Sequence, residues 1–155
     1  MKQKNVKVVF AELSFDSLPQ TVVSDVFERV EHEGPDGSRH VTFVYDDFDC
    51  PCKSLTRGGT MEEFEEYFRK EIDEKFASEI LRLERLGGFP RLSFSLATGN
   101  ASCSNTEVSR EMIDKLAGRG MSLGMAFASK SGETRIDFPA SLVKFLAKYH
   151  FSIAF

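Results

Sequence analysis

Apolar and polar residues alternate along several short stretches of the chain, and this period of two is typical of strands with one buried face. Residues 40–45 (HVTFVY) and 91–97 (RLSFSLA) show it. Residues 7–15 (KVVFAELSF) are more continuously apolar, which favours a largely buried strand, and residues 17–19 (SLP) then break the pattern. The final FSIAF, residues 151–155, predicts a further strand inserted in the same sheet.

A long apolar stripe predicts the clearest helix. Its members recur at spacings of three and four residues, as on one face of an α-helix: Met61, Phe64, Phe68, Ile72, Phe76, Ile80 and Leu83. Thr60 and Glu63 have the spacing of a capping box, in which a hydroxyl and a carboxylate satisfy free amides at the helix start. Gly87 and Gly88 are a stop signal. We predict one continuous helix between these signals.

Three shorter helices are also expected. Residues 21–30 contain four valines that could share one helical face, although β-branched side chains disfavour a helix. Residues 108–127 and 138–155 each read as a helix followed directly by a strand. Start signals are Thr106 or Ser109 for the first, and Asp137 before Pro139 for the second. The two units have weakly similar sequences. Either an old duplication or the separate origin of two similar elements would explain this.

The predicted order of elements is therefore β-α-β-α-β-α-β-α-β within a single domain over residues 1–155. Alternation of this kind packs helices on a sheet. The expected fold class is α/β (α+β), a two-layer sandwich with three to four helices on a mixed sheet of about five strands. Residues 33–38 (EGPDGS) are a turn signal between two of the elements.

Charge narrows the range of partners. The chain has a formal net charge of −4, which argues against broad nucleic-acid binding because that uses lysine and arginine to neutralise phosphates. Residues 46–79 hold eleven acidic side chains against five basic ones. No apolar window approaches the roughly 18 residues of a spanning helix. We therefore expect a cytoplasmic protein without a membrane partner, whose three cysteines are reduced.

The stretch DDFDCPC, residues 46–52, gathers three carboxylates and two thiols. Cys50 and Cys52 could bind metal with Asp47 or Asp49, or form a redox pair, but one intervening residue is too few for the usual zinc or dithiol spacing. Asp46 and Asp47 are adjacent, so they would point to opposite faces of a strand and would not form an acid–base pair. The alternatives are an acidic recognition edge or an ordinary strand end. No cofactor, metal or catalytic residue is predicted.

Residues 60–127 run from GGTMEEFEEYF through LRLERLGGFPRLSFSLA to VSREMIDKLAGRGMSLGMAF. This order of an acidic helix, an edge strand, a second helix and a second strand resembles a family of small bacterial α/β domains of unknown function. Some of those domains are thought to be immunity proteins encoded beside polymorphic toxins. The resemblance implies a protein-binding role, and it assigns no functional residue.

The leading hypothesis is a non-enzymatic bacterial immunity protein, a monomer or weak homodimer, that neutralises a cognate basic toxin by charge complementarity. The predicted partner contacts are Asp46, Asp47, Asp49, Glu62, Glu63 and Glu66. One rival is a small metal- or redox-linked protein centred on Cys50 and Cys52. Another is a structural domain that self-associates through an exposed strand edge.

Overall fold

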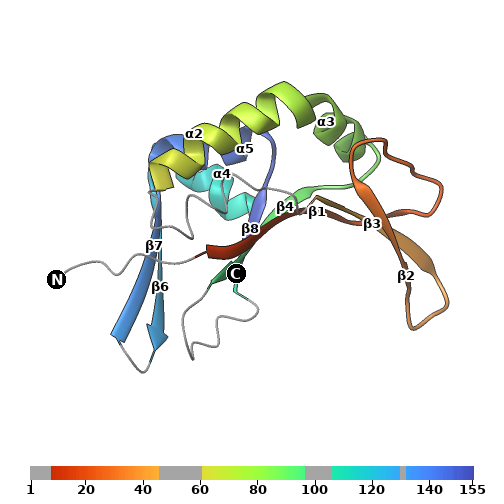
Figure 1. The fold of residues 1–155 in the computed structure, drawn as a ribbon, viewed down its shortest axis with the longest axis horizontal. Helices are drawn as coiled ribbons and strands as arrows, with labels where there is room; N and C mark the ends of the chain where they lie inside the picture. The colour runs from red at the N-terminus through yellow and green to blue at the C-terminus, as the bar shows by residue number, and fades with distance from the viewer. Residues whose placement is uncertain (1–7, 46–60, 97–105, 130–131) are drawn as a thin grey trace.

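The computed structural model describes residues 8–45, 61–96, 106–129 and 132–155. Within these ranges a six-stranded sheet, in the order β2-β3-β1-β4-β8-β5, carries the helices along one face (Figure 1). The strands are β1 (Val8–Pro19), β2 (Glu28–Glu33), β3 (Arg39–Tyr45), β4 (Pro90–Leu96), β5 (Glu107–Val108) and β8 (Ser152–Ala154). β8 runs parallel to β4 and antiparallel to β5, so the sheet is mixed. The predicted α+β class with a mixed sheet is confirmed.

The helices are α2 (Met61–Glu71), α3 (Ala77–Arg85), α4 (Arg110–Gly118) and α5 (Ala140–Lys148), with a π-helical turn, η1 (Ile72–Phe76), joining α2 to α3. β6 (Leu123–Ser129) and β7 (Gly132–Phe138) form a separate antiparallel pair between α4 and α5. Ser109 caps α4, since its hydroxyl accepts from the amide of Met112 at 3.2 Å. Of the two predicted start signals for this helix, Thr106 and Ser109, the cap is Ser109, and the predicted C-terminal strand is confirmed as β8.

The long predicted helix is present but is interrupted by η1, for a geometric reason. Its apolar stripe steps by four residues, through Phe64, Phe68, Ile72, Phe76 and Ile80, and all five side chains are buried. In a regular α-helix each four-residue step overshoots a full turn by about 40°, so the stripe would rotate off the sheet. A π-turn takes more residues per turn, through its i→i+5 bonds. The wider turn therefore brings the later apolar positions back towards the core.

Aromatic side chains hold the helices on the sheet. The ring of Phe68 on α2 meets Phe145 of α5 and Phe151 edge-on, with centroids 5.9 and 5.8 Å apart. The ring of Phe64 meets Phe94 of β4 at 5.6 Å in the same manner. Edge-to-face pairs at these separations add stabilisation beyond the burial of apolar area. The core is therefore continuous from β4 through α2 to α5.

The helix predicted over residues 21–30 is wrong. Residues 28–33 form the edge strand β2, and the segment before it is a turn. The Ser24 hydroxyl accepts from the amides of Val26 and Phe27, a local bond that competes with helix formation. The ring of Phe27 is buried against Phe15 and Phe76, at 5.3 and 5.6 Å. The burial of Phe27 in the core therefore outweighs the helical spacing of the four valines.

The predicted order of elements also needs correction. A strand, β2, stands where a helix was expected, and β7 is a strand that the predicted order does not contain. The break predicted at residues 17–19 is instead a register shift within β1 between Phe15 and Leu18, after which the strand continues to Pro19. A bulge of this kind bends a strand without ending it. The described residues thus form eight strands in two sheets rather than about five in one.

Candidate functional site

The six predicted contact residues are only partly described. Asp46, Asp47 and Asp49 lie outside the described residues, as do Cys50 and Cys52. Glu62 and Glu63 fall in the first turn of α2, and the side chain of Glu66 is exposed one turn later. Their convergence on one acidic surface stays a prediction.

The exposed face of the long helix carries mixed charge rather than an acidic surface. The side chains of Glu65, Glu71 and Glu79 are only 10%, 13% and 10% exposed, and they pair with Arg69, Lys75 and Arg82 respectively. Between residues 64 and 85 the charged residues that remain exposed are Glu66, Asp73, Glu74, Arg69, Lys70, Lys75, Arg82 and Arg85. Bases outnumber acids in this set, so the negative charge of residues 64–85 is largely neutralised within the fold.

The hairpin formed by β2 and β3 carries the acidic surface that is fully described. All six residues of β2 are exposed, and they include Glu28, Glu31 and Glu33 against the single base Arg29, which pairs with Glu31 at 2.7 Å. Arg39 of β3 is exposed opposite Glu33, so the hairpin as a whole, with Asp36 in its turn, carries a net charge of −2. Sequence reasoning missed this surface because it assigned part of the strand to a helix. The one local signal was the strong turn motif that follows at residues 33–38, since ERVEHE itself contains a single apolar residue, Val30.

The turn of this hairpin fixes its register. The amide of Gly34 donates to the carbonyl of Ser38 at 2.7 Å, and the amide of Gly37 donates to the carbonyl of Gly34 at 3.0 Å. Gly37 has φ of 80°, the left-handed conformation of a type I turn with a G1 bulge. Asp36 lies at the tip, and hydrogen bonds from the Ser38 hydroxyl and amide lower the pKa of its carboxyl. The tip therefore adds a further negative charge to the hairpin.

β2 is the first strand in the sheet order, so one side of it is open. In an antiparallel pair the residues alternate between those that bond to the neighbouring strand and those whose amide and carbonyl point away from it. Counting from the Gly34–Ser38 bond along the β2–β3 register, the outward groups belong to Arg29, Glu31 and Glu33. The hairpin therefore combines an open hydrogen-bonding edge with negative charge.

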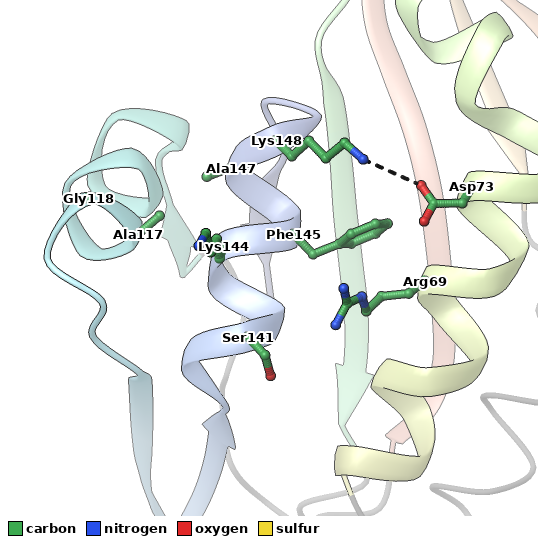
Figure 2. A pocket seen from close by; sticks show the side chains of 9 residues that line it. All are labelled: Arg69, Asp73, Ala117, Gly118, Ser141, Lys144, Phe145, Ala147 and Lys148. Carbon is green, nitrogen blue, oxygen red and sulfur yellow. Dashed lines mark ion pairs between the residues drawn. The ribbon is translucent and has the colours of Figure 1, made fainter.

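A groove of about 680 Å³ is the second candidate site (Figure 2). Its polar lining consists of Arg69, Asp73, Ser141, Lys144 and Lys148, and small side chains with the ring of Phe145 complete it. Figure 2 shows Arg69 and Asp73 on one side of α5 and the end of α4 on the other, so the groove crosses the outer face of α5. Three cations with one carboxylate give the lining a net positive charge.

The carboxylate in this groove is already engaged. The Tyr149 hydroxyl donates to Oδ1 of Asp73 at 2.5 Å, and Nζ of Lys148 lies 4.0 Å from the same oxygen. Burial, then the hydrogen bond to Asp73 and its charge, raise the pKa of Tyr149 to about 12. Tyr149 therefore remains a neutral donor at physiological pH, and Asp73 stays fixed by two partners.

Among the described residues, no group of three or more His, Cys, Asp or Glu side chains is placed to hold a metal ion. The described helices include none that is both long and apolar enough to cross a bilayer. Comparison with protein-family models, with curated proteins and with solved structures found no match to this chain. Function is therefore inferred from the β2–β3 hairpin and from the groove across α5.

Proposed function

We propose that this protein is a non-enzymatic binding protein that holds a basic protein partner against its acidic β2–β3 hairpin. The observation that carries the proposal is the edge strand β2, in which every residue is exposed and glutamates outnumber arginine three to one. Clustered carboxylates steer a basic partner and raise its association rate. The open backbone of Arg29, Glu31 and Glu33 offers hydrogen bonds to an extended segment of that partner, as in strand addition.

The biological role that fits such a surface is that of an immunity protein. Toxins that act on nucleic acid carry basic surfaces because they bind phosphate. An acidic partner covers such a surface by charge complementarity. The resemblance of residues 60–127 to small bacterial domains, some of which are thought to be immunity proteins, motivates this role, although the strand that is an edge strand in those domains, β4, lies inside the sheet here. In this role the chain acts in the cytoplasm and neutralises its toxin by occupying the toxin's phosphate-binding face.

The same open edge could pair with a second copy of the chain, but its charge disfavours that pairing. Each β2 carries a net charge of −2, so two β2 edges side by side would bring like charges together. Charged side chains on an edge strand are a common protection against edge-to-edge association. A basic partner relieves this repulsion, whereas a second copy increases it.

The start of α2 lies apart from the hairpin. Figure 1 shows the beginning of α2 and the β2–β3 hairpin at opposite ends of the molecule. Glu62, Glu63 and Glu66 therefore do not belong to the same compact contact as β2. The hairpin is the primary site in this proposal, and the α2 carboxylates are contacts only of a partner that reaches both ends.

The test uses three matched charge-reversal variants as baits in native extract, with wild type alongside. The hairpin variant is E28K/E31K/E33K, the α2 variant is E62K/E63K/E66K, and the control is E74K/E107K/D114K, whose three acids are exposed elsewhere. Mass spectrometry of stoichiometric partners at low salt provides the measurement. We expect one basic protein to be captured by wild type, by the α2 variant and by the control, but not by the hairpin variant. Equal capture by the hairpin variant would contradict the proposal.

A further inference from the structure

The groove across α5 is lined by three cationic side chains whose hydrogen-bonding capacity is only partly used by acceptors among the described residues. The Lys144 ammonium has no described carboxylate within 4.0 Å. Arg69 is about half exposed, and its ion pair with Glu65 is loose, at 3.3 Å. Lys148 is 64% exposed and lies at the 4.0 Å limit from Asp73. The pair of Lys148 with Asp73 is exposed on both sides and contributes little stability, so a ligand can recruit Lys148 and Lys144 at small cost. Arg69 must keep its bond to the buried Glu65, so it offers the ligand only its remaining N–H groups.

The polar groups that remain available are nearly all donors. Lysine and arginine donate without accepting, and the Ser141 hydroxyl adds a further donor. The one carboxylate, Asp73, has Tyr149 and Lys148 on the same oxygen, Oδ1, and the Ser141 hydroxyl can accept as well as donate. Donors and positive charge still predominate, which favours a ligand that is rich in acceptors and negatively charged. A phosphate group meets both conditions, since an arginine fork and lysine point charges are the usual phosphate-binding groups.

The size and remaining walls of the groove leave room for more than an inorganic ion. Its volume of about 680 Å³ lies within the range of small-molecule sites, about 300–1,000 Å³. The uncharged part of the lining comes from Ala117, Gly118 and Ala147, with Phe145 beneath the guanidinium of Arg69 at 5.3 Å. These walls suit the organic body of a ligand.

We infer that this groove binds a small organic phosphate, attracted by the positive charge of Arg69, Lys144 and Lys148, with the small side chains of α4 and α5 against its body. The site is independent of the hairpin, because no residue of β2 or β3 lines it. Its occupancy would also connect α2 to α5, since Arg69 and Lys148 stand on different helices. A ligand bridging them is expected to stabilise the fold by mass action.

The test titrates phenyl phosphate into the full chain and follows backbone amide resonances by NMR, with phenol as the uncharged counterpart. We expect saturable shifts at Ser141, Lys144 and Lys148 with phenyl phosphate and none with phenol. Lys144→Glu should weaken binding by at least about tenfold, or ~1.4 kcal/mol. Lys70→Glu is the matched control, because Lys70 is an exposed lysine outside the lining, and it should leave the affinity within about twofold.

Three results would overturn the inference. The first is the absence of saturation by phenyl phosphate at concentrations up to about 10 mM, which corresponds to negligible affinity. The second is an equal loss of affinity in the Lys70→Glu and Lys144→Glu proteins, which would mean attraction by overall charge alone. The third is saturable binding whose shifts map away from α5. Lys144 has no described partner, so its substitution should leave the folded spectrum intact.

Discussion

The hydroxyl of Tyr149, at the end of α5, donates a 2.5 Å hydrogen bond to the carboxylate of Asp73 in the π-helical turn η1. The two residues are 76 positions apart in the sequence. This bond connects the helix that carries Lys144 and Lys148 to the helix that carries Arg69. It therefore holds the two sides of the groove at a fixed separation.

Removing this hydroxyl should cost modest stability. We expect Tyr149→Phe to lower the free energy of unfolding at neutral pH by about 1 kcal/mol, the usual net value of one hydrogen bond. A larger effect is not expected because Asp73 is about half exposed and water can replace the lost donor. Urea denaturation with a fitted midpoint and slope gives the measurement. A variant as stable as wild type would show that the bond is not formed in solution.

The same bond has a pH dependence of defined sign. Folding raises the pKa of Tyr149 from 10.0 to about 12, so the folded chain holds this proton more tightly than the unfolded chain. The associated stability is complete below a pH of about 10 and is lost as the pH rises through about 12. The stability difference between wild type and Tyr149→Phe should therefore shrink between pH 10 and 12. A difference that stays constant across this interval would contradict the assignment.

Ser24 should be the local determinant of the turn before β2. Its hydroxyl accepts from the amides of Val26 and Phe27 and donates to Glu79 of α3 at 2.9 Å. Ser24→Ala removes all three bonds, and we expect a loss of about 1–2 kcal/mol, as for a helix or turn cap. Ser24→Thr keeps a hydroxyl and should recover most of this loss. Equal stability of the alanine variant and wild type would rule out this role.

The hairpin turn depends on a residue without a side chain. Gly37 adopts φ of 80°, which an L side chain rarely does, and the added methyl of alanine would meet no neighbouring atom. Gly37→Ala should therefore cost about 1 kcal/mol through backbone strain alone. Gly118→Ala also adds a methyl in open space, but without a positive φ, and should be neutral or slightly stabilising. Thermal unfolding of the two variants in parallel tests this contrast, and equal melting temperatures would contradict it.

Burial on α3 gives a matched pair of leucines. Leu83 is fully buried, and Leu81 on the same helix is 43% exposed. Leu83→Ala leaves a cavity in the core and should destabilise the fold by about 2–5 kcal/mol. Leu81→Ala should change the stability by less than about 1 kcal/mol. Chemical denaturation of both proteins checks the inward orientation of the stripe, and similar losses would refute it.

The sequence predicts well wherever one periodicity dominates. The alternation around Val41 and Phe43 and the stripe from Phe64 to Leu83 led to β3 and to the long helix, because burial on one face imposes those periods. The four valines of residues 21–30 imitate a helical face, and the tertiary burial of Phe27, together with the local bonds of Ser24, decides against it. For the same reason the sequence did not predict the edge strand β2, since the valine pattern extends into its first residues.

The groove shows a different limit. Arg69 and Lys148 are ordinary surface cations within their own helices, and nothing in either local sequence marks a site. They line one groove only because α5 packs beside α2 through Phe68 and Phe145. Convergence of this kind depends on tertiary packing. The charge balance of the long helix was equally hidden, since it depends on which carboxylates are shielded by basic neighbours.

The most direct test of the hairpin proposal is residue-resolved amide hydrogen exchange, with the chain free and then bound to the basic partner captured by wild type. The open-edge amides of Arg29, Glu31 and Glu33 should exchange quickly in the free chain and at least about tenfold more slowly in the complex, because strand addition gives them acceptors. Protection confined to these amides and their neighbours in β2 is the predicted result. Unchanged exchange along β2, with protection at the start of α2 instead, would contradict a partner site on the hairpin.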